Sequence, residues 1–215
     1  MSLMKHVLTL FVLTHAALSA HAEPERFVVI DDPVFGAGAI TRDTVSGLDW
    51  LDLALTRGYS YAAMKKALAA DGRFAGFRHA TRDDLVTLWR HFGLRDLPMG
   101  TFARPDHVPR VERYIGVFGD TCTPAQCDDP RFPRTMSHGV IDEVRELAAF
   151  GVAVATLVEV DAQRFTDALA VNTRIGHGAG GLGVDDGREH VGHYLVRVRA
   201  GTPGAAGVAT SATPR

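Results

Sequence analysis

The stretch from Gly47 to Gly93, GLDWLDLALTRGYSYAAMKKALAADGRFAGFRHATRDDLVTLWRHFG, constrains the fold more than any other part of the chain. It predicts a short aromatic strand followed by two helices with a glycine-rich link between them. Ser60 is a suitable N-cap for a first helix from Tyr61 to about Asp71, because its hydroxyl can accept an otherwise unpaired backbone N–H. Gly72 can then end this helix in the left-handed conformation.

The second helix has the clearest start and stop signals in the sequence. Thr81 and Asp84 have the spacing of a capping box, with Asp in place of the usual Glu. Leu85, Leu88, Trp89 and Phe92 follow at the i, i+3, i+4, i+7 spacing of one helix face, and Gly93 ends the pattern. We therefore expect a helix from about residue 82 to residue 92, with its Trp and Phe in the core.

Strands are predicted on both sides of these helices. The β-branched and aromatic runs are Arg26–Ile30, Thr41–Val45, Leu48–Leu53, Arg113–Gly119, Val152–Val160 and the alternating His193–Arg199. The segment VIDEVRELAAF, residues 140–150, favours a short helix. We expect a surface loop at GHGAGGLG and a hairpin turn at the Asp-Gly of residues 186–187. Early helices, later strands and a closing amphipathic strand indicate an α+β fold.

The first residues have the pattern of a secretory signal. Lys5 precedes an apolar run, and Ala20-His21-Ala22 has the small-x-small pattern of a cleavage site. We expect a signal peptide at residues 1–22, a single domain at residues 23–199 and a disordered tail at residues 200–215. The predicted location is secreted or periplasmic, and an uncleaved membrane anchor is the alternative. No second apolar stretch approaches membrane-spanning length.

Composition narrows the classes of partner. The formal net charge is −2, which argues against nucleic acid or an anionic membrane as the ligand. Cys122 and Cys127 are the only cysteines, and Pro124 lies between them. In an oxidising compartment this pair favours a disulfide that closes a small loop. A redox or metal pair is the alternative, although the spacing is not C-x-x-C and no nearby cysteine or histidine completes a zinc set.

Four motifs carry a resemblance to a known family: GLDWLD, the helix start SYAAM, FAGFRHATRDDL and the final HYLVRVR. Together they resemble the collagen-like-protein C-terminal (Lcl C-terminal) domain family, and also exported proteins that often end in an exopolysaccharide-associated sorting signal. The match covers about Asp43–Gly93 and Val184–Arg199. Phe77 stands where the family has Trp, His79-Ala80 where it has Leu-Pro, and the sorting signal is absent. The resemblance implies a C-type-lectin-like fold, with two helices flanking a curled antiparallel sheet whose terminal strands pair, and binding of sulfated or other polysaccharides.

Residues with the chemistry of a catalytic or metal site are scattered. The calcium-binding triplets of C-type lectins are absent, and turn chemistry accounts for Asp185 and Asp186, so we assign no cofactor and no metal. His190 and His193 are three apart on an expected strand, which places them on opposite faces, so they and His177 do not form a predicted site. There is no G-x-S-x-G nucleophile motif.

The function that fits best is a non-catalytic binding module, with extracellular polysaccharide or an envelope protein as its partner. An envelope-compartment enzyme acting on glycans or peptides is one alternative, and a structural matrix or envelope protein is the other. Aromatic faces stack on sugar rings while polar side chains bind the hydroxyls, and loops carry such residues. The predicted ligand-binding residues are Phe102, Arg104, His107, Phe132 and Arg134.

Overall fold

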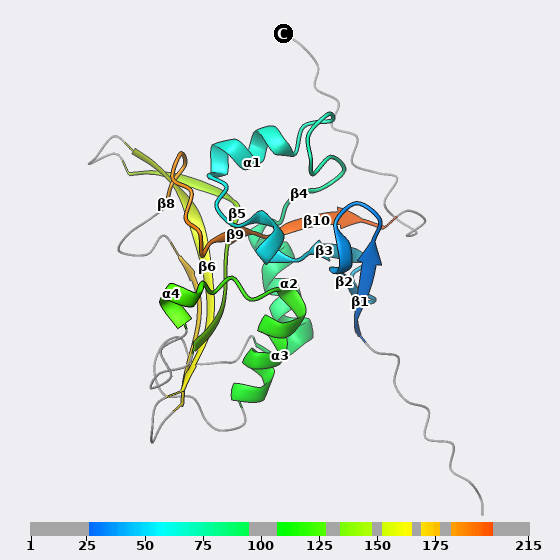
Figure 1. Cartoon of the computed structure of the whole chain (residues 1–215), viewed down its shortest axis with the longest axis vertical. Coiled ribbons are helices and arrows are strands. Elements are labelled where there is room, and N and C mark those ends of the chain that lie inside the picture. Colours follow the sequence, from blue (N-terminus) through cyan, green and yellow to red (C-terminus); the bar gives the residue numbers. More distant parts are fainter. Residues whose placement is uncertain are drawn as a thin grey trace, which may run out of the picture.

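The computed structural model describes residues 26–94, 107–127, 134–147, 152–164, 169–176 and 182–199. It contains two β-sheets with helices α2 and α3 packed between them (Figure 1). The predicted α+β class is confirmed. Within the described residues, no helix combines the length and apolarity that a bilayer crossing requires. The predicted signal peptide and tail lie outside the described residues.

The first sheet, sheet A, has the strand order β1-β2-β3-β10-β4. Its strands are β1 (Phe27–Asp32), β2 (Gly36–Asp43), β3 (Leu48–Leu51), β10 (Leu195–Val198) and β4 (Arg78–His79), and every pair is antiparallel. The predicted strand at residues 26–30 is confirmed as β1, and the strand expected at Leu48–Leu53 is confirmed as β3 but ends at Leu51. β2 begins at Gly36, directly after a turn that the Asp32 carboxylate closes by accepting the backbone N–H groups of Val34 and Phe35.

The expected pairing of the terminal strands is wrong. β1 and β10 lie in the same sheet, but β2 and β3 separate them. The reason is local: the chain from Phe27 to Asp43 closes on itself as a hairpin, with Phe27 opposite Asp43. The vacant edge of β3 is then filled by β10.

The second sheet, sheet B, is built on one long hairpin. β5 (Arg134–Leu147) pairs antiparallel with β6 (Val152–Arg164), and β6 also pairs with β7 (Leu169–Gly176) and the short β8 (Leu182–Gly183). β9 (Gly192–His193) pairs parallel to β5 and forms the other edge. The helix expected over residues 140–150 is therefore wrong, because pairing with β6 overrides the helical propensity of its Glu, Arg and Leu residues.

The helices follow the sequence signals with two differences. α1 (Tyr61–Ala67) has the predicted Ser60 cap, but it ends at Leu68 before Gly72 is reached. α2 (Arg82–Phe92) has the full capping box and the left-handed Gly93. α3 (Val108–Phe118) replaces the strand expected at Arg113–Gly119. Its buried residues, Val111, Tyr114, Ile115 and Phe118, have helical spacing, which a short apolar run alone does not distinguish from a strand.

The main core lies between the two sheets. It joins residues of sheet A, including Trp50 and Val196, to residues of sheet B, including Val158, through the buried faces of α2 and α3. A second, smaller core covers part of the opposite face of sheet A, where Ile40, Leu51 and Leu195 pack against Met64 of α1 and the buried Phe74 and Phe77. Another part of that face contains a surface depression.

The last two strands, β9 and β10, follow each other directly in the chain but belong to different sheets. The predicted final strand His193–Arg199 is divided at Tyr194 into β9, which pairs with sheet B, and β10, which pairs with sheet A. The turn is centred on residues 184–185 and not on the predicted Asp-Gly at 186–187, and Asp186 accepts the backbone N–H of Gly183. It does not form the expected hairpin, because β8 pairs with β6 while β9 pairs with β5.

Candidate functional site: an arginine-lined depression on sheet A

The predicted ligand-binding residues fall into two groups. Phe102, Arg104 and Phe132 lie outside the described residues, and for them the prediction stands as made. His107 is buried immediately before α3. Arg134 begins β5, where its Nε donates to Asp161 Oδ1 at 2.8 Å. Both described side chains therefore take part in packing or ion pairing within the domain.

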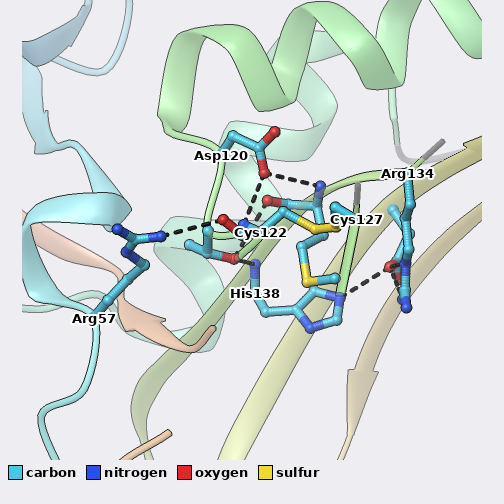
Figure 2. Close-up of a disulfide and its surroundings, with 9 residues drawn as sticks. Arg57, Asp120, Cys122, Cys127, Arg134 and His138 are labelled. Carbon is cyan, nitrogen blue, oxygen red and sulfur yellow. Dashed lines mark hydrogen bonds and ion pairs between the residues drawn. A yellow bond between two sulfur atoms is a disulfide. The ribbon is translucent and has the colours of Figure 1, made fainter. Parts of the chain in front are cut away.

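The predicted disulfide is present and fixes a short helical turn. Cys122 and Cys127 are bonded across α4 (Pro124–Cys127), with their Cα atoms 6.0 Å apart (Figure 2). Asp120 Oδ1 accepts the backbone N–H of Cys122 at 2.8 Å, and Arg57 donates to the Cys122 carbonyl at 3.2 Å. The disulfide thus joins α4 to Cys122, and hydrogen bonds hold Cys122 to Asp120 and to Arg57, which is a structural role.

A buried carboxylate lies close to this disulfide. Asp161 Oδ1 is 3.1 Å from His138 Nε2 and also accepts from Arg134 (Figure 2 shows the two donors). Burial opposes ionisation of Asp161, but the hydrogen bond and charge of His138 and the charge of Arg134 outweigh it, so its pKa is lowered. The carboxylate is held as an ion in a structural network. Among the described residues, no group of three or more His, Cys, Asp or Glu side chains could hold a metal ion.

A row of alternating charges crosses the open face of sheet A. Arg42 on β2 is opposite Asp49 on β3, and Asp49 is opposite Arg197 on β10. Arg42 donates to Asp49 from Nε at 2.8 Å and from Nη2 at 3.0 Å, a two-point contact that raises the pKa of Arg42. Arg197 Nε lies 3.6 Å from Asp49 Oδ2.

Arg197 has two further contacts that fix its position. Its Nη2 donates to Asp32 Oδ2 at 2.9 Å, and its guanidinium lies over the Phe77 ring, 4.8 Å from the ring centre. Burial opposes ionisation of Asp32, but the hydrogen bonds from Val34, Arg197 and Phe35 outweigh it and lower its pKa. The turn between β1 and β2 and the second core thus hold this arginine in one orientation.

Arg42, Asp49 and Arg197 line a surface depression of about 430 Å³, together with Val198 and Arg199. Arg199 follows β10 two residues after Arg197, so it lies on the same face of the sheet. Arg199 is exposed and forms no ion pair with a carboxylate of the described residues. The three arginines of the depression carry three positive charges, and Asp32 and Asp49 carry two negative charges. The group therefore has a net charge of +1. The volume of the depression is in the range typical of small-molecule sites.

The sequence analysis did not identify this set. The alternation in LVRVR indicated that Arg197 and Arg199 share a face, but it did not indicate what lies across from them. Arg42 and Asp49 are brought opposite each other by the β2–β3 hairpin, and β10 joins them from more than a hundred residues away. Asp32 is the last residue of β1, at the start of the turn to β2.

A second polar cluster is buried beneath α1, where the Tyr61 ring lies over His79. His79 Nε2 lies 2.9 Å from His193 Nδ1, and His193 Nε2 lies 3.0 Å from the Tyr59 carbonyl oxygen. His79 is 2% exposed and His193 0%, so neither can meet a ligand from solvent. Sequence spacing separated His193 from His190. The structure pairs His193 with His79 and places His190 near His138, with ring centres 6.3 Å apart.

The fold and this depression define an α+β domain with a positively charged, partly preformed surface site. No family model, curated protein or solved structure matches the chain.

Proposed function

We propose that this protein is a secreted or periplasmic, non-catalytic binding module of C-type-lectin-like fold that binds acidic extracellular polysaccharide. The observation that carries the proposal is the arginine-lined depression formed by Arg42, Asp49, Arg197, Val198 and Arg199. The resemblance of the GLDWLD and HYLVRVR motifs to a polysaccharide-binding family supports it independently. The signal pattern of residues 1–22 supports the location.

The chemistry of the depression suits an anionic sugar. A guanidinium group presents planar N–H donors that match carboxylate and sulfate oxygens. Arg42 directs Nε and Nη2 at Asp49, and Arg197 directs Nη2 at Asp32, so each keeps other N–H groups for a ligand. Arg199 has its whole guanidinium free of carboxylate partners among the described residues. The carboxylate or sulfate of an acidic sugar would pair with Arg199. The hydroxyls of the same sugar would accept hydrogen bonds from Arg42 and Arg197.

The net charge of the depression determines how tightly we expect it to bind an acidic sugar. One excess positive charge on an open surface gives a weak, salt-screened attraction for a single sugar acid. A polymer offers many equivalent acids, so repeated encounters along one chain raise its overall affinity. We therefore expect binding to acidic polymers that is far tighter than binding to the corresponding monosaccharides. The residues Phe102, Arg104 and Phe132 remain predicted contacts for the same polymer.

Substitution of one arginine tests the proposal. The purified protein is titrated with polyuronate, sulfated and neutral polysaccharides by calorimetry, at about 50 mM and about 300 mM salt. We expect Arg199→Gln to weaken binding to the acidic polymers by about five- to ten-fold, the cost of about 1 kcal/mol for a charged hydrogen bond at an exposed site. Higher salt should weaken binding of the unsubstituted protein and have less effect on the variant.

Arg90→Gln is the matched control. Arg90 is an exposed arginine near the end of α2, outside the depression, so its loss removes the same charge elsewhere. We expect this variant to bind like the unsubstituted protein. Equal binding of neutral and acidic polymers, or equal loss of affinity in both variants, would contradict the proposed site. Absence of binding to every polymer would contradict the proposed function.

A further inference from the structure

A hydrogen bond between two buried histidines links the ends of the two sheets. His79 lies on β4, the last strand of sheet A, and His193 lies on β9, the last strand of sheet B. Their imidazole nitrogens are 2.9 Å apart. Backbone hydrogen bonds close the same joint, because Ala80 donates to the Tyr194 carbonyl at 2.7 Å and Tyr194 donates to the Val140 carbonyl at 3.0 Å.

The hydrogen bonds assign the protons on both rings. The Tyr59 carbonyl can only accept, so His193 Nε2 must carry a proton. In a neutral ring, His193 Nδ1 is then a bare acceptor, and His79 Nε2 must carry the proton that it receives. His79 Nδ1 is consequently unprotonated, and it is buried without a hydrogen-bond partner.

Protonation of either ring places a proton on His79 Nδ1. If His79 becomes charged, the new proton is on Nδ1. If His193 becomes charged at Nδ1, His79 Nε2 must turn from donor to acceptor, which again moves a proton to His79 Nδ1. In both cases the cluster gains a buried N–H without an acceptor, together with a positive charge, and such groups are costly in a protein interior.

The surrounding groups offer this charge little compensation. The Tyr61 ring of α1 lies over His79, with ring centres 5.0 Å apart and a tilt of 20°. Asp142 on β5 is the nearby anion, but it already accepts from the Tyr61 hydroxyl at 2.7 Å and from Lys65 Nζ at 3.1 Å. Lys65 repels a charged His79. On the His193 side, Thr56 Oγ1 accepts the backbone N–H of His193 at 2.7 Å and adds no charge.

We propose that the His79–His193 pair is an acid-sensitive joint, closed while both rings are neutral and opened between the sheets when the pair takes up a proton. The energetics agree with the geometry. Burial lowers the pKa of His79 to about 3, with a further contribution from His193, and burial lowers the pKa of His193 to about 4. Each ring therefore binds a proton more readily in the opened chain, where its pKa is about 6.5.

The sign of the pH dependence follows from these shifts. Above about pH 6.5 both states are neutral and the closed joint is fully stable. As the pH falls from about 6.5 towards 4, the opened state gains protons that the closed state excludes, so stability is lost over that window. From pH 7 to pH 5 the opening equilibrium constant rises by about 20-fold for each histidine. The buried carboxylates act at lower pH, because an unfolded Asp titrates near 3.9.

The joint is coupled to the proposed ligand site through one strand. β10 follows Tyr194 directly, pairs with β4 next to His79 and carries Arg197 into the depression. This consequence rests on the proposed function: opening of the joint at acidic pH should release the bound polysaccharide. The joint itself does not depend on the ligand, and its test uses no ligand.

Hydrogen exchange and nitrogen NMR test the joint on the full chain. Protection factors are measured at about pH 7 and about pH 5 for the backbone N–H groups of Ala80, His193 and Tyr194. We expect them to fall by at least about ten-fold at the lower pH. In His79→Gln/His193→Gln, whose amides can form uncharged hydrogen bonds, the fall should be less than about three-fold.

His91→Gln is the control, since His91 lies on α2 and pairs with Asp43, away from the joint. It should keep the ten-fold fall at the three joint positions. A double variant that retains the fall would overturn the proposal. So would nitrogen spectra of the unsubstituted protein that show a protonated Nδ1 on either ring at pH 7, and this measurement holds even if the double variant does not fold.

A binding assay at the two pH values separates the joint from the ligand site. If no polysaccharide binds at pH 7, the proposed function fails, while the exchange result still decides the joint. If polysaccharide binds equally at both pH values although the joint opens, the joint stands and its coupling to the depression is rejected.

Discussion

At Gly192 on β9 the surrounding packing leaves no room for a side chain. A Cβ atom at this position would meet the backbone carbonyl of Leu53, and it would lie 2.9 Å from Thr56 Oγ1. Leu53 and Thr56 belong to the 3-10 turn η1 (Leu53–Thr56), whose backbone cannot move without disturbing the His193 N–H contact. The sequence places a glycine here, but the reason for it is a contact with a segment far away in the chain.

We expect Gly192→Ala to lower the free energy of unfolding by about 1–3 kcal/mol, because the methyl group has no space that a flexible side chain could vacate. Gly116→Ala is the control: a Cβ at Gly116 in α3 meets no atom within 4 Å. Alanine is the better helix former there and should raise stability by about 0.5–1 kcal/mol. Urea denaturation of both variants gives their free energies of unfolding. The decisive result is a decrease for Gly192→Ala together with an increase for Gly116→Ala.

At the scale of elements, α2 depends most directly on its own sequence. The Thr81 hydroxyl accepts the backbone N–H of Asp84, and the Asp84 carboxylate accepts the backbone N–H of Thr81 at 2.8 Å. Asp84 also receives a hydrogen bond from Arg78, which links the helix start to β4. Its pKa is lowered because these hydrogen bonds outweigh the effect of burial.

Thr81→Ala should therefore cost about 1 kcal/mol of stability, the usual value of an N-cap. Thr87→Ala, in the middle of the same helix, is matched in chemistry but removes no cap, and it should be neutral or slightly stabilising because alanine has the higher helix propensity. Thermal denaturation of the two variants distinguishes a capping effect from a general effect of losing a threonine. Equal melting temperatures would contradict a role for the cap.

Other elements were decided by their neighbours. The segment at residues 140–150 contains good helix formers, yet its described residues 140–147 lie in β5, where Val140 and Val144–Leu147 pair with β6. The apolar residues of α3 were expected to form a strand, and the helix appears because Tyr114 and Phe118 then face Phe92 and Trp50 in one core. In both segments, tertiary contacts outweigh a local preference that is worth only tenths of a kcal/mol per residue.

At the scale of the whole molecule, the disulfide adds a covalent constraint on α4, at the segment between α3 and β5. The loop closed by Cys122 and Cys127 is short, with a sequence separation of 5, so it removes little entropy from the unfolded chain. On the chain-entropy model the contribution is about 2 kcal/mol.

Cys122→Ser/Cys127→Ser should accordingly lower the free energy of unfolding by about 2 kcal/mol. The variant should keep the fold, because neither cysteine belongs to the main core. Reducing agent should lower the stability of the unsubstituted protein by the same amount and leave the variant unchanged. A reductant effect on the variant would show that the loss has another origin.

The sequence by itself determined the features that depend on neighbouring residues: the caps of α1 and α2, the left-handed Gly93, the β1 strand and the close cysteine pair. Hydrogen bonds over two to four residues and short loops fix these features, so their signals are local. The tertiary structure alone decided the sheet order, the change of sheet at Tyr194, the arginine-lined depression and the His79–His193 pair. Each of these joins residues that are distant in the chain, and their contact energies exist only once the two sheets have closed on the core.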